Sequence, residues 1–149
     1  MKGWLLDTNV IAELSRVKPD TRVARWIISQ PEQALFLSIL TIAEYQKGLH
    51  HLPQGDKLRS RIERSVRALE ARFSSRVLSV SDPIALRWGA ISGEVKRLTG
   101  HSPSVVDTLL AATALEHNLY FATRNVAHVA HSGAAVFNPW TDDPAQFPL

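Results

Sequence analysis

The chain has 149 residues, contains no cysteine and carries a formal net charge of +3. The absence of cysteine excludes disulfides and thiolate metal sites, and the length is typical of one domain with its own core. No apolar stretch approaches the roughly 18 residues that a membrane helix needs, and the first residues lack the pattern of a secretory signal. We therefore expect one domain over residues 1–149, in a cytoplasmic protein that contacts no membrane.

The first part of the chain alternates short apolar runs with helical patterns. Residues 4–6 form an apolar run that ends at Asp7, and residues 34–38 form a second run, so both predict strands. Asp7 or Thr8 is expected to cap a helix directly after the first strand. Residues 20–30 predict another helix, which stops before a proline.

Two amphipathic helices are expected in the middle of the chain, after a shorter helix that Thr41 would cap. The first shows apolar residues three or four positions apart, at Leu58, Ile62, Val66, Leu69 and Phe73. The second follows Asp82–Pro83, which reads as an N-cap with a proline in the first turn, and it closes at Gly100.

Three further apolar runs predict strands over residues 77–80, 119–122 and, more weakly, 134–137. The helix expected over residues 104–117 is apolar nearly all round, which is typical of a buried helix. Short strands that alternate with helices favour an α/β domain with a mostly parallel central sheet of four to five short strands, flanked by helices on both faces. Ligands of such sheets gather at the carboxyl ends of the strands.

Three acidic residues stand out by their surroundings: Asp7 after the first strand, Glu44 after the second, and Asp107 at the start of the apolar helix. Each has a structural explanation, since Asp7 can cap a helix, Glu44 can form a capping box with Thr41, and Asp107 can pair with Ser104. For each residue alone, the structural explanation and a role in a functional site both stay open. Carboxylates beside apolar segments are costly unless they are paired, and no basic residue is close in sequence to Asp7 or Asp107.

Convergent carboxylates are typical ligands of a hard divalent cation. Mg²⁺ or Mn²⁺ binds oxygen ligands, keeps several waters and is completed by substrate phosphate. Such a cation polarises a phosphodiester oxygen and lowers the pKa of a bound water. The histidine pairs His50–His51 and His128/His131 do not form a zinc pattern with other ligands.

Four segments resemble the PIN domain family: LLDTNVIAEL at 5–14, IAE at 42–44, VVDTLLAATALEHNL at 105–119 and FATRNV at 121–126. Their order and separations match the family, and the resemblance covers nearly the whole chain. More narrowly, these segments and the NPW at 138–140 are similar to the VapC/FitB-like toxins of type II toxin–antitoxin pairs. The fold that the resemblance implies is a single PIN domain over the α/β pattern described above.

The resemblance implies that Asp7, Glu44 and Asp107 are the catalytic acids and hold Mg²⁺ or Mn²⁺. It also implies a set of supporting residues, namely Thr8, Asn9, Thr123 and Asn125.

The chain departs from the family pattern at two positions. Many PIN domains have a fourth acid where this chain has Asn125, and a further acid where it has His128. An amide can hold a metal water but adds no charge, so the site would carry −3 and we expect one metal ion.

Basic residues are concentrated between residues 56 and 76, where seven of them stand against three acidic ones. This segment is either a solvated helix face with pairs such as Glu63 and Arg67, or a surface for a polyanion. On the second reading, the residues expected to bind RNA are Arg61, Arg64 and Arg124.

The resemblance implies a metal-dependent endoribonuclease, the toxin of a type II toxin–antitoxin pair, which hydrolyses RNA with a metal-activated water and leaves a 5′-phosphate and a 3′-hydroxyl. The expected partners are the RNA substrate, a small cognate antitoxin that binds DNA, and a second copy of the chain in a homodimer. The alternative is a catalytically weak PIN-like protein that acts mainly by binding within an antitoxin–DNA repressor complex. A phosphohydrolase of small molecules is a third reading, which turnover of a phosphomonoester would reveal.

Overall fold

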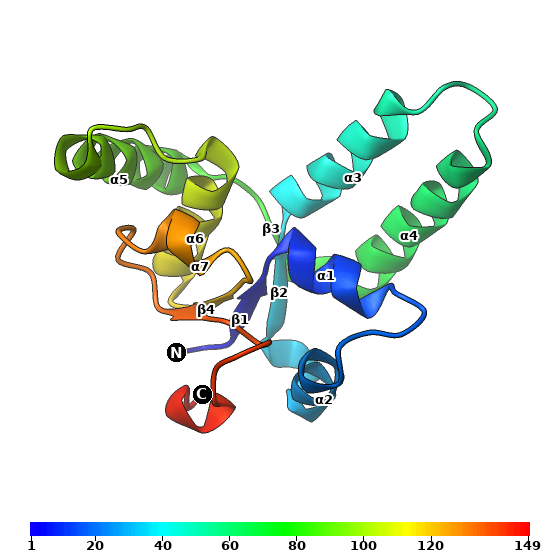
Figure 1. Cartoon of the computed structure of the whole chain (residues 1–149), viewed down its shortest axis with the longest axis horizontal. Helices are drawn as coiled ribbons and strands as arrows, with labels where there is room; N and C mark the ends of the chain where they lie inside the picture. The colour runs from blue at the N-terminus through cyan, green and yellow to red at the C-terminus, as the bar shows by residue number, and fades with distance from the viewer.

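A five-stranded parallel sheet forms the centre of the computed structural model, which describes residues 1–149 (Figure 1). The strands are β1 (Trp4–Leu6), β2 (Leu35–Ser38), β3 (Val77–Leu78), β4 (Tyr120–Ala122) and β5 (Val136–Phe137). They lie in the order β3-β2-β1-β4-β5, and every neighbouring pair is parallel. The prediction of an α/β fold with four to five short strands is confirmed.

Seven α-helices and three short 3-10 turns connect the strands. The helices are α1 (Thr8–Leu14), α2 (Thr21–Ser29), α3 (Ile39–His51), α4 (Lys57–Phe73), α5 (Asp82–Thr99), α6 (Val105–His117) and α7 (Val126–Val129). The 3-10 turns are η1 (Glu32–Ala34), η2 (Ser74–Arg76) and η3 (Pro144–Gln146). No helix is both long and apolar enough to cross a membrane.

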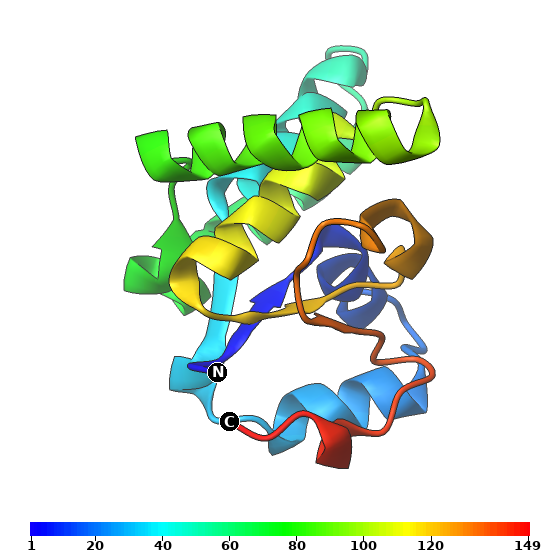
Figure 2. The same ribbon diagram turned by 90° about the vertical axis from the view of Figure 1, so that its left-hand side faces the viewer.

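Alternation along β1 places apolar side chains on both faces of the sheet, because successive residues of a strand point to opposite sides. Trp4 and Leu6 belong to a buried cluster that includes residues of α1, α2 and α4. Leu5, on the other face, packs with residues of α6 and α7. Helices therefore cover both faces, as predicted, and α5 lies along α6 on the outside of this second layer (Figure 2).

Several element boundaries differ from the prediction. Ser38, and not Thr41, caps α3: its hydroxyl accepts a hydrogen bond from the backbone N–H of Leu40 at 3.1 Å. The N-cap of α5 is Ser81, one residue before Asp82. The third strand is shorter than predicted because β3 is an edge strand that pairs only over two positions. The short helix α7 was not predicted.

The C-terminal tail packs against the core through aromatic rings. Phe147 lies 4.9 Å from Phe137 between ring centroids, and the hydroxyl of Tyr120 donates to the carbonyl oxygen of Pro148 at 3.0 Å. Trp140 also packs against the main cluster. Trp140 and Phe147 are thus half-buried within the chain itself, which leaves less of their apolar surface for contacts with a second copy.

The strand order changes direction at β1. The chain moves from β1 to β2 and β3 on one side, and then returns to place β4 and β5 on the other side. A crevice outside the carboxyl ends of the strands is typical of such a switch point. The residues after β1 and β4, which include Asp7 and Thr123, therefore lie where a ligand is expected.

Candidate active site

Asp7 is the first residue after β1, and its carboxylate is almost fully buried, with 4% of the residue exposed. Its backbone N–H donates to the carbonyl oxygen of Ala122, which extends the pairing of β1 with β4 by one step. Asp7 is also the N-cap of α1, since its Oδ1 accepts from the N–H of Thr8 at 2.7 Å. Asp7 therefore does cap α1, as the structural explanation expects. The cap uses only Oδ1, so Oδ2 is left for other partners.

Oδ2 of Asp7 accepts two side-chain hydrogen bonds. The hydroxyl of Thr123 donates to it at 2.6 Å, and the side-chain amide of Asn9 donates at 3.0 Å. The same Thr123 oxygen accepts from the backbone N–H of Asn125 at 3.0 Å. Asn9 in turn accepts from the backbone N–H of Arg124 at 3.2 Å. These contacts fix the orientation of the Asp7 carboxylate against the end of β4.

Glu44 lies on α3, one turn after Thr41, and is half-buried. Because Ser38 caps the helix, the prediction of a capping box between Thr41 and Glu44 is wrong. Thr41 is instead buried inside α3, where its hydroxyl accepts a hydrogen bond from the hydroxyl of Thr8 at 3.1 Å. Glu44 and Thr8 line one shallow cavity of about 220 Å³, so Glu44 faces the segment that follows Asp7.

Asp107 lies in the first turn of α6. Ser104 caps this helix by accepting from the backbone N–H of Asp107 at 3.3 Å, so the Asp107 carboxylate is not needed for the cap. Its Oδ2 instead lies 2.9 Å from Nδ1 of His128, and 15% of the Asp107 side chain is exposed. His128, which replaces an acid of the family pattern, thus contacts one of the three predicted acids.

The pKa of Asp7 is raised from 3.8 to about 6. Burial is the main cause, since it disfavours the charged carboxylate, and the hydrogen bonds from Thr123 and Thr8 oppose it. The negative charges of Asp107 and Glu44 add to the increase, which places both acids within electrostatic range of Asp7. A cation bound at this position would remove this penalty on the charged form.

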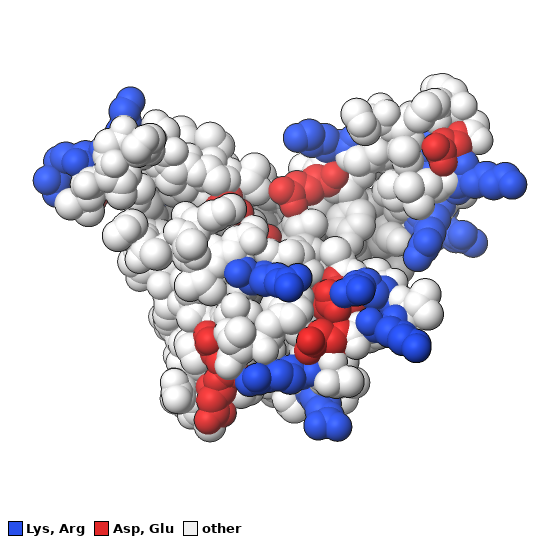
Figure 3. Space-filling view, viewed as in Figure 1, with Lys and Arg blue, Asp and Glu red and all other residues white.

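The electrostatic effects of Glu44 and Asp107 on Asp7 indicate that the three acids lie in one region of the molecule. Figure 3 shows acidic side chains at the base of a hollow that separates α5 and α6 from α3 and α4. No three histidine or acidic side chains are close enough to form a complete set of metal ligands by themselves. The donor set nevertheless suits Mg²⁺ or Mn²⁺, because such ions bind through one or two carboxylates, keep several waters and take further oxygen ligands from a substrate phosphate.

Asn125 and the predicted RNA-binding arginines are exposed at the surface. Asn125 is the N-cap of α7, makes no side-chain cap hydrogen bond and is exposed. Arg61 and Arg64 are exposed on α4, and Arg61 lines a cavity of about 290 Å³ between α1, α3 and α4. Arg124 is exposed, and its guanidinium lies 5.1 Å from the centre of the Trp140 ring.

Other basic residues of the 56–76 segment have partners within the chain. Arg59 donates to two backbone carbonyls at the end of α3, while Arg72 and Arg76 pair with Glu32. Only part of the predicted basic surface is therefore available to a ligand. The sequence did not predict the ion pairs of Glu32, because their partners are some forty residues away along the chain. It did not predict the role of Thr41, because α3 begins earlier than expected.

Comparison with known proteins identifies the family. Residues 4–130 match the PIN domain. The chain is 38% identical to the toxin FitB of Neisseria gonorrhoeae over 141 residues, which cover 93% of this chain and 99% of that protein. It is 34% identical to a VapC ribonuclease of Sinorhizobium fredii over 139 residues, 91% of this chain and 96% of the relative.

A solved structure agrees with these relatives. The structure of FitAB bound to a DNA fragment superimposes with a TM-score of 0.83, at 34% identity, and the match covers 94% of this chain and 97% of that one. The predicted similarity to VapC/FitB-like toxins is confirmed. The match of residues 4–130 to the PIN domain and the 38% identity to FitB over 93% of this chain establish that this chain belongs to the PIN domain family.

Proposed function

We propose that this protein is a metal-dependent endoribonuclease and the toxin of a type II toxin–antitoxin pair, with residues 1–149 forming one PIN domain. The observation that supports this most is the buried Asp7 carboxylate at the switch point of the sheet, with Glu44 and Asp107 in electrostatic range. The similarity to a protein named a VapC ribonuclease and to the toxin FitB supports the same activity and the same biological role.

Asp7, Glu44 and Asp107 would hold the cation, as Mg²⁺ or Mn²⁺. When bound, the cation would polarise a phosphodiester oxygen and lower the pKa of a water. Thr123 and Asn9 hold the Asp7 carboxylate in one orientation, and His128 does the same for Asp107. This positioning matters because electrostatic catalysis depends on groups that need not reorganise during the reaction.

The proposed partners follow from the same relatives. FitAB was solved on a DNA fragment, which supports a small antitoxin that binds DNA as the partner of this chain. We also propose a homodimer. Large exposed apolar side chains remain for such contacts, among them Leu86 on α5 with 76% and Ile28 on α2 with 82% exposed. Sedimentation of the isolated chain at micromolar concentration tests this, and a monomer would contradict it.

The test of the activity is cleavage of single-stranded RNA in the presence of Mg²⁺ or Mn²⁺, with EDTA as the metal-free condition. Asp7→Asn and Asp107→Asn should each abolish cleavage and leave the fold intact, because binding of a hard cation requires charge as well as oxygen. Asp143→Asn, the same change at an exposed residue of the tail, is the matched control. Near wild-type turnover of either site variant at saturating metal would remove that residue from the site.

One observation keeps a second function in view. Asn125 stands where many PIN domains have a fourth acid, and it is exposed without a side-chain cap contact. A site with fewer negative charges binds a cation less tightly, which favours a catalytically weak protein that acts by binding within an antitoxin–DNA repressor complex. Metal-dependent cleavage that is lost in Asp7→Asn would decide for the enzyme. Operator binding with antitoxin, without any cleavage, would decide for the second function.

A further inference from the structure

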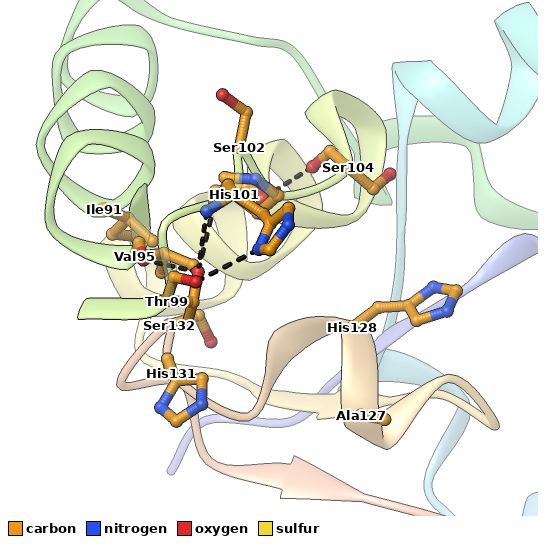
Figure 4. A pocket seen from close by; sticks show the side chains of 12 residues that line it. Ile91, Val95, Thr99, His101, Ser102, Ser104, Ala127, His128, His131 and Ser132 are labelled. Carbon is orange, nitrogen blue, oxygen red and sulfur yellow. Dashed lines mark hydrogen bonds between the residues drawn. The ribbon is translucent and has the colours of Figure 1, made fainter. Parts of the chain in front are cut away.

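A cavity of about 410 Å³ lies beside the acidic site, between the end of α5, the loop before α6, the start of α6 and α7 (Figure 4). Three histidines from two separate segments line it: His101, His128 and His131. The lining contains no Asp, Glu, Lys or Arg side chain. Neither the fold nor the three acids account for this concentration of imidazole rings.

The cavity adjoins the predicted reaction centre. His128 lines the cavity, and its Nδ1 lies 2.9 Å from the carboxylate of Asp107. In Figure 4 the His128 ring extends away from His101 and His131, so it stands at the border between the cavity and the acid. Thr108, the next residue after Asp107, is also part of the lining. A chain molecule bound at Asp107 would therefore reach the cavity with its neighbouring unit.

The lining offers flat rings and polar groups that lack partners. Nδ1 of His101 lies 3.0 Å from the carbonyl oxygen of Thr99; a carbonyl only accepts, so Nδ1 carries the proton and Nε2 is left for another partner. Figure 4 shows no hydrogen bond to the ring of His131 or to the hydroxyl of Ser102, and both residues are exposed. Ile91 and Val95 add apolar surface.

These features fit a flat, polar, uncharged ring better than other ligands. A phosphate site would need Lys, Arg or a comparable concentration of donors, and the lining has no Lys or Arg. A zinc site would need several ligands around one point, and no three histidine or acidic side chains are that close. Small-ligand sites usually have volumes of about 300–1,000 Å³, so the cavity is large enough for one nucleoside.

We propose that this cavity is a subsite that takes one unpaired base of an RNA chain bound at Asp7, Glu44 and Asp107. The inference rests on the proposed ribonuclease function and extends it to the form of the substrate. Proteins that read RNA sequence bind mostly single-stranded segments, whose bases stack on aromatic rings, including His, and form hydrogen bonds along their edges. His101 and His131 provide the rings, and Ser102 and the free ring nitrogens provide the hydrogen-bonding groups.

The test measures RNA binding separately from cleavage. A short fluorescein-labelled single-stranded RNA is titrated with the full chain in Ca²⁺, a hard cation that binds oxygen ligands and can join the three acids to a phosphate. A series of the same RNA lacks the base at one position after another. His101→Ala/His131→Ala should bind the intact RNA roughly ten- to a hundredfold more weakly than wild type, because base stacking on an aromatic ring is lost. Removal of the base at one position should weaken RNA binding by wild type by a similar factor. The same removal should leave the affinity of the double variant nearly unchanged.

His50→Ala/His51→Ala is the matched control, since these two exposed histidines lie on α3, outside the cavity. This variant should bind every RNA as wild type does. Should the double variant in the cavity fail to fold, His131→Ala alone serves, because no hydrogen bond holds its ring. At saturating RNA and metal, the cavity variants should cleave at a rate within about twofold of wild type and show a raised KM.

Equal affinity of the wild type and the cavity variants, or equal sensitivity of both to every abasic position, would overturn the subsite. A wild-type chain that does not bind the RNA would overturn it too, as would Zn²⁺ binding in a calorimetric titration that disappears in His101→Ala/His131→Ala. A chain that passes the binding test and never cleaves RNA would instead contradict the proposed catalysis and leave the base subsite in place.

Discussion

The hydroxyl of Thr123 donates a 2.6 Å hydrogen bond to Oδ2 of Asp7, although 116 positions of the chain separate the two residues. The bond joins the ends of two adjacent parallel strands, β1 and β4. It also lowers the pKa of Asp7 against the opposing effect of burial, so it favours the charged carboxylate that a cation requires.

Thr123→Val should weaken both the fold and the activity at neutral pH. Valine has nearly the shape of threonine but cannot donate, so the buried carboxylate loses a charge-assisted hydrogen bond worth about 1.5–3 kcal/mol. We expect the free energy of unfolding in denaturant to fall by that order and RNA cleavage to fall with it. Thr123→Ser retains the hydroxyl and should keep most of the cleavage activity. Equal losses of cleavage in both variants would show that the hydrogen bond does not matter.

The stability of the metal-free protein should decrease as the pH rises through the titration range of Asp7. Its pKa is 3.8 before burial and about 6 in the folded chain, so the folded state binds this proton more tightly than the unfolded state. Such a group stabilises the fold when protonated, and this contribution is lost between about pH 4 and pH 6. Asp7→Asn cannot lose a proton, so its free energy of unfolding relative to wild type should increase over this pH window by about 1–3 kcal/mol.

Asparagine has a single acceptor oxygen at a position where Asp7 accepts three hydrogen bonds, which reduces the net gain. At pH 7 in EDTA we therefore expect Asp7→Asn to be more stable than wild type by on the order of 1 kcal/mol. Denaturant unfolding at a series of pH values measures the difference, with Asp143→Asn as the control. A difference that does not change between pH 4 and pH 7 would mean that Asp7 does not titrate in this range.

Mg²⁺ or Mn²⁺ should raise the thermal midpoint of wild type more than that of Asp7→Asn. A ligand that binds only the native state stabilises it by about 2.7 kcal/mol at 100 times its Kd, and the variant should bind the cation poorly. The advantage of Asp7→Asn in EDTA should thus shrink or reverse when metal is added. If Asp7 were only the cap of α1, both proteins would shift equally, since Asn is a nearly equivalent cap.

Asn125→Asp should lower the Mg²⁺ concentration that gives half-maximal RNA cleavage, by roughly threefold to tenfold, because a fourth negative charge strengthens binding of a hard cation. Asp is also a favourable N-cap residue, so α7 should keep its structure. Asn125→Ala adds no charge and serves as the control. An unchanged metal requirement in Asn125→Asp would place this residue outside the metal site.

Charge reversal of Arg61 and Arg64 together should weaken RNA binding and flatten its dependence on salt. Each phosphate contact that is lost should reduce the slope of log K against log salt by about 0.7 for a single strand. The double reversal of Lys18 and Arg25, exposed residues before and within α2, is the control. If the slope is the same in both double variants, the free part of α4 is a solvated face.

Local patterns were sufficient to predict those elements whose sequence repeats with a clear period. The spacing from Leu58 to Phe73 predicted α4, which spans Lys57–Phe73. The apolar run before Asp7 predicted β1 in the same way. The four residues of α7 are too few to display a helical period, and β3 is shorter than its apolar run because only two of its residues pair with β2.

The contacts of the site depend on strand order, which no local pattern contains. The sequence indicated that Asp7 and Thr123 follow strands, but the hydrogen bond between them requires β4 to lie next to β1. The contact of Asp107 with His128 likewise requires α6 and α7 to pack together. Thr41 shows the opposite error, because the spacing of Thr41 and Glu44 matched a capping box by chance while α3 already began at Ile39.

The pairing of β1 with β4 also determines when during synthesis the protein becomes complete. A nascent chain that has left the ribosome only as far as α5 contains Asp7 and Glu44, and it lacks Asp107, Thr123 and the strand that pairs with the end of β1. Domains assemble as cooperative units, and although β1 can pair early with β2, its other neighbour β4 follows more than a hundred residues later. The proposed active site can therefore assemble only when translation of the chain is nearly finished.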